Sequence, residues 1–276
     1  MPFGGPRAGR EAPMELTRLT KVTTALKANA LELAILTGHL LLYPSGIVSE
    51  RPAGAPAPGA GPGRPVVLLH GFVDNRSVFV LLRRSLARHG RHHIGSFNYS
   101  PLTCDLRAAA ALLGRHVEEL CARTGQQEVD IVGHSLGGLI ARYYVQRQGG
   151  DARVRTLVML GTPHTGTTAI PWAGAHPLVR QMRPGSEVLR ELAEPAAGCR
   201  TRCVSFWSDL DQVMVPVETA RLDHPDLLVH NVRVSGIGHL ALPVHPTVAA
   251  GIRQALDDEE PGVVTPDADP GAASVA

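Results

Sequence analysis

The hydrophobic pattern between residues 66 and 256 alternates between two kinds of stretch. Short runs of consecutive apolar residues are typical of strands buried on both faces of a parallel sheet, and between them apolar residues recur every three or four positions, as in helices. Strands are predicted at Val66–Leu69, Ile94–Tyr99, Val129–Val132, Val154–Leu160, Arg202–Trp207 and Leu227–Val234. Helices are predicted at Ser77–His89, Asp105–Arg123 and Pro246–Leu256, and another opens at Gly138. Parallel strands joined by helical crossovers make an α/β fold, with a mainly parallel sheet and helices on both faces.

A different pattern precedes this domain. The apolar positions within residues 17–43 are spaced three and four residues apart: Leu19, Val22, Leu26, Leu33, Leu36 and Leu40. They predict a long amphipathic helix, interrupted at Asn29 and stopped by Pro44. Its second half is apolar nearly all round except for Glu32 and His39. Three interpretations stay open: the helix packs against the following domain, it lies in a membrane interface with its basic residues near headgroups, or it is an export signal.

The segments around these elements differ in composition. Residues 1–16 are rich in Gly, Pro and Arg, residues 51–64 are rich in Pro, Gly and Ala, and residues 257–276 are acidic. Such segments cannot form a packed core, so we expect an irregular N-terminus, a linker and a disordered tail. The N-terminal helical segment then spans 17–50 and the sheet domain spans 65–256.

The alternation of strands and helices breaks after Gly161-Thr162-Pro163. Residues 164–200 contain several prolines and only one stretch with a helical pattern, Ser186–Leu192. In an enzyme, an insertion of this kind over one edge of the sheet would be a cap or lid. The alternative is an irregular loop with no gating role.

Composition limits the classes of function. The formal net charge of the 276 residues is +2, so nucleic-acid binding is not expected. The sequence contains no stretch of 18 apolar residues uninterrupted by charged ones, which argues against an integral membrane protein. None of the four cysteines lies in a spacing typical of a zinc site, and neither a metal nor an organic cofactor is expected. Cys199 and Cys203 either pair, if the protein is exported, or remain free thiols.

The strand predicted at Val129–Val132 leads into Gly133-His134-Ser135-Leu136-Gly137, a G-x-S-x-G sequence, and then into a helix. A serine on a tight strand-to-helix turn has its hydroxyl exposed, and the two glycines remove Cβ atoms that would collide with the strand and the helix. The pentapeptide alone is a weak signal in a glycine-rich chain, so its position between a strand and a helix carries the inference. Ser135 is therefore predicted to be a nucleophile.

A serine nucleophile needs a histidine to accept its proton and a carboxylate to orient that histidine. His239 follows the last predicted strand in a glycine-rich loop and is the predicted base. Asp209 and Asp211 both follow the strand Arg202–Trp207. Asp211 is preferred because it lies deeper in the loop, ahead of apolar residues that would anchor it, and Asp209 would then cap the strand end. The order Ser135, Asp211, His239 is the one expected for this arrangement on an α/β sheet.

A tetrahedral oxyanion needs preformed donors, which are often backbone N–H groups. One predicted donor is the amide of Leu136 at a helix N-terminus, where the helix dipole also favours negative charge. The other is the amide of Phe72 in the loop after the first strand, which Gly71 allows to come close to the nucleophile. The neighbouring histidines, His70 and His134, are interpreted as structural.

Together these residues resemble a bacterial lipase or esterase of the α/β-hydrolase superfamily, close to the class 2 triacylglycerol lipases. The resemblance covers about residues 64–256 and is carried by His70-Gly71-Phe72, Gly133–Gly138, Leu160-Gly161-Thr162-Pro163-His164 with Gly166, and the Asp211 and His239 loops. It implies an α/β-hydrolase fold and a carboxylic-ester hydrolase that forms an acyl-enzyme on Ser135. The Leu-Gly-Thr-Pro-His sequence also occurs in related acyltransferases and glycolipid deacylases, so the substrate stays open. The N-terminal helix and linker depart from the minimal form of these lipases.

We therefore expect a serine lipase or esterase that cleaves acyl esters of lipids. The expected substrate contacts are His164 and apolar residues of the insertion, namely Ile170, Trp172, Leu178, Val179 and Met182. Two other interpretations stay open: a transacylase in which an alcohol intercepts the same acyl-enzyme, or a non-catalytic hydrolase-fold protein at a membrane. Peripheral membrane contact through residues 17–43 is favoured, with a secreted or cytoplasmic location as alternatives, and the oligomeric state is open.

Overall fold

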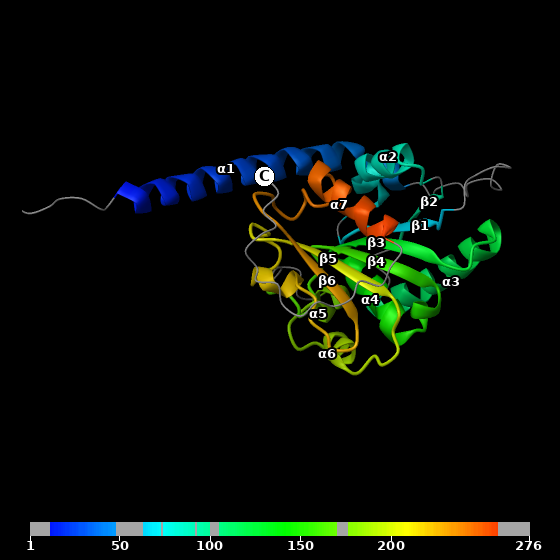
Figure 1. The fold of residues 1–276 in the computed structure, drawn as a ribbon. Coiled ribbons are helices and arrows are strands. Elements are labelled where there is room, and N and C mark those ends of the chain that lie inside the picture. The colour runs from blue at the N-terminus through cyan, green and yellow to red at the C-terminus, as the bar shows by residue number, and fades with distance from the viewer. Residues whose placement is uncertain are drawn as a thin grey trace, which may run out of the picture.

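The computed structural model describes residues 12–47, 63–72, 74–91, 93–99, 105–169 and 176–258. Its centre is a sheet with the strand order β2-β1-β3-β4-β5-β6 (Figure 1). The strands are β1 (Val66–Leu69), β2 (Ile94–Phe97), β3 (Val129–His134), β4 (Val154–Leu160), β5 (Arg202–Ser208) and β6 (Leu228–Val234). All neighbouring strands in the sheet are parallel, which confirms the predicted α/β architecture.

Helices cover both faces of this sheet (Figure 1). They are α2 (Val80–Arg88), α3 (Leu106–Thr124), α4 (Leu136–Arg147), α5 (Pro177–Gln181), α6 (Glu187–Ala193) and α7 (Pro246–Asp257), preceded by the long helix α1 (Ala12–Ile47). Successive residues of β1 enter different cores. Val66 and Leu68 pack with residues of α2 and α7, whereas Val67 and Leu69 pack with residues of α3 and α4. Burial on both faces explains why this strand is a continuous apolar run.

The order of the strands reverses at β1. Leu69 of β1 pairs with Phe97 of β2 on one side and with Gly133 of β3 on the other. The chain therefore first adds a strand on one side of β1 and then crosses to the other side. In open α/β sheets, ligands bind beyond the carboxyl ends of the strands at such a point.

Helix α1 is longer than predicted at both ends. It begins at Ala12, inside the segment 1–16 that the sequence predicts to be irregular, and it continues past Pro44 to Ile47. A proline removes one backbone donor, and the last carbonyls of any helix lack intrahelical partners. Here the sheet domain supplies those partners. The side chains of Asn75, Arg76 and Asn98 donate to the carbonyls of Tyr43, Ser45 and Gly46 at 2.9, 3.0 and 3.1 Å, respectively.

The face of α1 that packs on the sheet domain is not the leucine stripe found in the sequence. Ala28 and His39 are buried against the domain, whereas Leu26, Leu33 and Leu40 are 62%, 66% and 66% exposed. Figure 1 shows that the N-terminal part of α1 extends beyond the domain. Among the described helices, none is long and apolar enough to cross a membrane.

The insertion contains two described helices, α5 and α6, where the sequence predicts one. Pro177 occupies the first position of α5, where its missing donor costs nothing, and the side chain of His176 accepts a hydrogen bond from the Leu178 amide at 3.2 Å. This helix is too short to produce a recognisable period. Arg142 of α4 donates to the carbonyl of Leu192 in α6 at 2.9 Å. The described part of the insertion is therefore packed on the sheet domain.

Candidate active site

Ser135 lies in the turn between β3 and α4 and has an unusual backbone conformation. Its φ is 53° and its ψ is −120°, a positive φ that non-glycine residues rarely adopt. Two contacts with neighbouring β4 and its loop hold the turn: the Ser135 amide donates to the carbonyl of Leu160 at 2.8 Å, and the Thr162 hydroxyl donates to the carbonyl of Ser135 at 3.2 Å. Strain of this kind persists only where the surrounding structure enforces it, and it concentrates at functional sites.

The two outer glycines of the motif are required by close backbone contacts. A Cβ atom on Gly133 would lie 2.6 Å from the amide nitrogen of Gly138. A Cβ atom on Gly137 would lie 2.5 Å from the carbonyl oxygen of Leu69 on β1. Both neighbours are backbone atoms, which cannot move aside as a flexible side chain can. The G-x-S-x-G sequence is thus the local cause of the tight turn.

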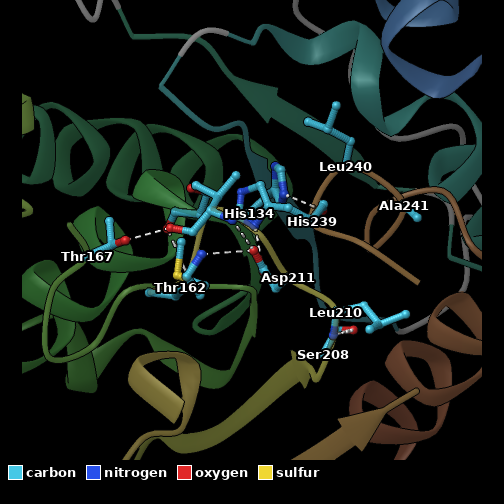
Figure 2. Close-up of polar contacts among 12 residues, drawn as sticks. His134, Thr162, Thr167, Ser208, Leu210, Asp211, His239, Leu240 and Ala241 are labelled. Carbon is cyan, nitrogen blue, oxygen red and sulfur yellow. Dashed lines mark hydrogen bonds and ion pairs between the residues drawn. The ribbon is translucent and has the colours of Figure 1, made fainter. Parts of the chain in front are cut away.

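His239 and Asp211 form a buried pair. Their side chains approach to 2.7 Å between Nδ1 of His239 and Oδ2 of Asp211, and the residues are 5% and 2% exposed (Figure 2). The other carboxylate oxygen, Oδ1, accepts hydrogen bonds from the amides of Val213 at 2.9 Å and Met214 at 3.0 Å. The loop after β5 therefore fixes the carboxylate, and the carboxylate fixes one ring nitrogen of His239.

Asp209, the alternative acid, lies elsewhere. Its carboxylate forms an ion pair with Arg233 of β6 at 2.8 Å, on the more exposed side of the loop. Of the two aspartates that follow β5, the structure brings Asp211 to His239. The sequence alone cannot show which of Asp209 and Asp211 contacts His239, because residues two apart in an irregular loop can point in any direction.

Asp211 and His239 shift each other's pKa in opposite directions. Burial alone would lower the pKa of His239, but the charge and hydrogen bond of Asp211, followed by the charges of Asp74 and Glu32, raise it above its ordinary value of 6.5. Burial alone would raise the pKa of Asp211, but His239 and the amides of Met214 and Val213 hold it below its ordinary value. Asp211 therefore stays ionised, and its charge favours the protonated form of the imidazole.

His134 and Gly161 connect the pair to the Ser135 turn. The ring of His134, the residue before Ser135, lies 4.7 Å from the ring of His239, and its Nε2 donates to the carbonyl of His239 at 3.2 Å (Figure 2). A Cβ atom on Gly161 would lie 3.0 Å from both Oδ2 of Asp211 and Nδ1 of His239. These contacts place the three predicted residues at the carboxyl ends of β3, β5 and β6.

The loop after β1, which contains Phe72, also reaches the turn. A Cβ atom on Gly71 would lie 3.4 Å from Cβ of Ser135, so the loop passes directly beside the serine. His70 braces the loop: its Nδ1 donates to the Gly71 carbonyl at 2.8 Å and its ring stacks on Tyr99 at 4.5 Å. Leu136 begins α4, where the first amides have no intrahelical acceptor. Both predicted amide donors thus belong to segments that border Ser135.

His164, a predicted substrate contact, lies between α4 and β5. It is buried, with Nε2 at 3.1 Å from the hydroxyl of Ser205 and Nδ1 at 3.3 Å from the guanidinium of Arg142. Burial, reinforced by the nearby charge of Arg142, lowers the pKa of His164 well below its ordinary value. His164 is therefore a neutral side chain that joins α4 to β5 within the core.

The apolar residues predicted to contact substrate are core residues where the structure describes them. Leu178, Val179 and Met182 are almost fully buried in the cluster that also contains Leu136 and residues of α3 and α4. Ile170 and Trp172 lie outside the described residues. The half-buried ring of Phe72 packs against this same cluster and meets the edge of His176 at 4.9 Å.

Two acidic residues near the site are absent from the sequence prediction. Asp74 lies in the loop after β1, with Oδ2 at 3.6 Å from Nδ1 of His134 and Oδ1 at 3.9 Å from Nδ1 of His39 on α1. Glu32 of α1 binds the loop that carries His239. No sequence motif indicates that Asp74 lies near the site. Glu32 could have been noticed because it is a carboxylate in an otherwise apolar half of a predicted helix.

Among the residues that the structure describes, no cluster of His, Cys, Asp or Glu is arranged to hold a metal ion. Cys121, Cys199 and Cys203 are free thiols, and Cys104 lies outside the described residues. Burial raises the pKa of the Cys203 thiol to about 12. This cysteine is therefore an unreactive core residue.

Comparisons with known proteins agree with this architecture. A family described as the alpha/beta hydrolase fold matches residues 64–188. Among solved structures, the chain is similar to the mature Bacillus licheniformis lipase BlEst2, with 16% identity and a TM-score of 0.59 over 76% of this chain and 96% of that one. Aspergillus fumigatus lipase B is 17% identical, with a TM-score of 0.63 over 76% of this chain and 57% of that one.

A third similar structure is a bacterial membrane phospholipase A, at 18% identity and a TM-score of 0.51 over 88% of this chain and 97% of that one. At these identities the likeness shows a shared fold. Together with the family match over residues 64–188, which include the first strands and the Ser135 turn, it shows that the chain has the α/β-hydrolase fold.

Proposed function

We propose that the protein is a serine carboxylic-ester hydrolase, a lipase or esterase that acts through an acyl-enzyme on Ser135. The observation that carries the proposal is the buried Asp211–His239 pair at 2.7 Å, held against the strained turn that presents Ser135. A hydrolase fold alone hosts many functions, so the proposal rests on this arrangement and not on the fold.

In the proposed reaction, the Ser135 hydroxyl attacks the carbonyl carbon of the ester. His239 accepts the hydroxyl proton at Nε2, because Nδ1 faces Asp211. The C–O bond to the alcohol then breaks, and His239 returns the proton to the leaving oxygen. Water, deprotonated by the same imidazole, attacks the acyl carbon. The bond between that carbon and Oγ of Ser135 then breaks, His239 returns the proton to Oγ, and the carboxylic acid leaves. Asp211 orients His239 and stabilises the imidazolium in both halves of the reaction.

The charge that develops on the carbonyl oxygen would be held by the amides of Leu136 and Phe72. Each preorganised donor of this kind stabilises a transition state by about 2.7–4 kcal/mol. The helix α4 adds a favourable dipole at Leu136, since the oxyanion lies at its N-terminus. Side chains at these two positions do not take part, so their substitution would test packing instead of the donors.

A lipid ester is the proposed substrate class, and helix α1 is proposed to contact the lipid surface. The support is the exposed apolar face of α1, formed by Leu26, Leu33, Leu36, Leu40 and Leu41, with Leu41 77% exposed. Exposed leucines along one helix provide apolar area that can be buried in the plane of a membrane interface. The names of the structural neighbours, two lipases and a membrane phospholipase A, are consistent with this class.

The experiment that tests the proposed function combines a fluorophosphonate probe with p-nitrophenyl esters of graded acyl chain length. Wild type is expected to react with the probe and hydrolyse the esters, and Ser135→Ala is expected to do neither. Hydrolysis by Ser135→Ala at the wild-type rate would contradict the proposal. Product analysis with an added alcohol distinguishes hydrolysis from transfer of the acyl group, because only a transacylase would yield mainly the new ester.

A further inference from the structure

Glu32 of α1 binds the loop that carries His239. Its Oε2 accepts a hydrogen bond from the amide of Leu240 at 2.9 Å, and its Oε1 accepts one from the amide of Ala241 at 2.9 Å. These two amides directly follow His239 in the chain. The contact joins residues more than 200 positions apart, and each oxygen of the carboxylate has its own partner.

The loop is shaped to receive this carboxylate. A Cβ atom on Gly238 would lie 2.5 Å from Cδ and 2.8 Å from Oε1 of Glu32, so the backbone before His239 lies directly against the Glu32 side chain. Gly236 has a φ of 82°, which turns the chain at the end of β6 toward α1. Glu32 therefore contacts the loop on both sides of His239, at Gly238 and at Leu240.

The same turn of α1 also binds the loop that carries Asp211. Asn29, three residues before Glu32, accepts a hydrogen bond from the side-chain amide of Gln212 at 2.6 Å. Residues three apart lie on the same side of a helix. A single helical turn is thus hydrogen-bonded to both loops of the buried pair, beside Asp211 in one and beside His239 in the other.

The energetics favour a carboxylate over an uncharged residue at this position. Hydrogen bonds from backbone amides to an ionised carboxylate are roughly twice as strong as those between neutral groups. Glu32 is partly exposed, and the two loop amides replace the water that its carboxylate gives up where α1 meets the loop. The contact with the His239 loop therefore explains why a carboxylate occupies position 32.

We propose that Glu32 is a positioning residue for His239, and that helix α1 is in this way a working part of the active site. Glu32 acts through the loop backbone and does not touch the substrate. Asn29 assists by holding the neighbouring Asp211 loop. The role rests on the proposed function of Ser135, Asp211 and His239, and it places the N-terminal helix inside the hydrolase machinery.

The charge of Glu32 provides a signature that a purely structural contact would lack. The charged and titratable groups that face His239 are Asp211 after β5, Asp74 after β1, His134 on β3 and Glu32 on α1. After burial, which lowers the pKa of His239, the three carboxylates raise it in the order Asp211, Asp74 and Glu32. Neutralising Glu32 removes one raising influence, so the imidazole should lose its proton at a lower pH.

Glu32→Gln is the decisive variant because its shape is nearly unchanged. The amide side chain has one acceptor oxygen, so one of the two loop amides loses its partner and faces an N–H₂ group. We expect kcat for a soluble short-chain p-nitrophenyl ester to fall roughly 10- to 100-fold with little change in KM, since small misplacements of a catalytic group cost this much. The acidic limb of the pH profile should also move to lower pH.

Glu119→Gln on α3 is the matched control, since it makes the same change at an exposed position on a different helix. It should match wild type in kcat, KM and pH profile. Glu32→Gln with wild-type kcat and an unshifted acidic limb would overturn the positioning role. An NMR titration of the His239 ring gives a second readout, and an unchanged pKa in Glu32→Gln would likewise count against the proposal.

Failure of the proposed function gives a different result. In that case wild type itself would not react with a fluorophosphonate, or Ser135→Ala would react equally well. If the wild-type reaction depends on Ser135 but is unaffected by Glu32→Gln, only the positioning role fails. Circular dichroism and Tm, compared with wild type, show whether Glu32→Gln is still folded, so that a lower kcat is not caused by unfolding. If Tm falls, the NMR titration still tests the proposal.

Discussion

The β3–α4 turn and helix α1 approach the His239 loop by different physical means. At the turn, backbone atoms meet: Gly133 and Gly137 contact main-chain atoms of α4 and β1, and Ser135 accepts an unfavourable φ of 53°. At α1, side chains meet backbone: Glu32 binds two loop amides at a partly exposed surface. The turn has no space for an added atom on either glycine. The contact of Glu32 consists of two separate hydrogen bonds, so a substitution can remove one and leave the other.

The candidate site therefore has an inner part positioned by the sheet and an outer part positioned by the N-terminal helix. The inner part presents Ser135 and fixes Asp211 through the amides of Val213 and Met214. The outer part influences the position of the His239 loop and raises the pKa of His239. Changes in the inner part should therefore abolish activity, and changes in the outer part should reduce it.

After the loss of Ser135 itself, the largest effect is expected at Asp211. Replacing it by asparagine leaves the shape but removes the charge that orients His239, so kcat should fall by about 10⁴-fold. Asp209→Asn is the control, since Asp209 pairs with Arg233 instead. Steady-state kinetics on a p-nitrophenyl ester check this. The reverse ranking of the two variants would assign the acid to Asp209.

Gly137→Ala should be the next most damaging change. The added methyl group would lie 2.5 Å from the Leu69 carbonyl oxygen, so either β1 or the Ser135 turn must shift. We expect a loss of about 1–3 kcal/mol in the free energy of unfolding and a loss of activity of roughly 100-fold or more. Gly95→Ala, on the edge strand β2 where the added atom meets open space, should be nearly silent in both chemical denaturation and kinetics. Equal effects of the two would show that the turn tolerates a larger residue.

The pH profile of wild type should have an acidic limb set by His239. Its pKa is raised above 6.5, so the imidazole becomes protonated and unable to act as a base as the pH falls through a value above 6.5. Below that pH, kcat/KM should drop about tenfold per pH unit. The pKa of Asp211 is lowered, so Asp211 stays ionised over this range. Measurement of kcat/KM between mildly acidic and mildly basic pH tests this, and a profile that stays flat well below 6.5 would contradict it.

The smallest effect on a soluble ester is expected from the exposed face of α1. Leu33→Ser with Leu40→Ser should leave hydrolysis of a short-chain p-nitrophenyl ester unchanged, because both side chains point away from the sheet domain. Flotation with phospholipid vesicles should nevertheless be reduced several-fold. Leu81→Ser on α2, another exposed leucine, is the control for nonspecific apolar binding. Undiminished flotation of the double variant would remove α1 from the proposed lipid contact.

The parts of the molecule that follow from local chemistry could be predicted from the sequence. Strands such as Val66–Leu69 are buried on both faces, which requires a run of apolar residues. The Ser135 turn needs glycines at fixed offsets, and these appear as a motif. The loop residue His239 could be found because a glycine-rich loop after a strand is visible in the sequence.

The parts that depend on contacts between distant segments could not be predicted. Helix α1 passes Pro44 because side chains of the sheet domain bind its last carbonyls, and no local signal indicates this. Packing on the following domain was one of three interpretations of this helix, and the side that packs there contains Ala28 and His39 instead of the leucine stripe. His164 follows a motif at the edge of the site, but Arg142 and Ser205 draw it into the core. In each case a long-range partner decides the outcome.

The most direct test of the account is to identify the residue that a fluorophosphonate modifies. The protein is incubated with the probe, digested, and analysed by mass spectrometry, with Ser135→Ala and Asp211→Asn treated in parallel. We predict a single covalent adduct on the peptide that contains Ser135, no adduct in Ser135→Ala, and much slower labelling of Asp211→Asn. An adduct on a different serine, or undiminished labelling of Ser135→Ala, would contradict the assignment of Ser135 as the nucleophile.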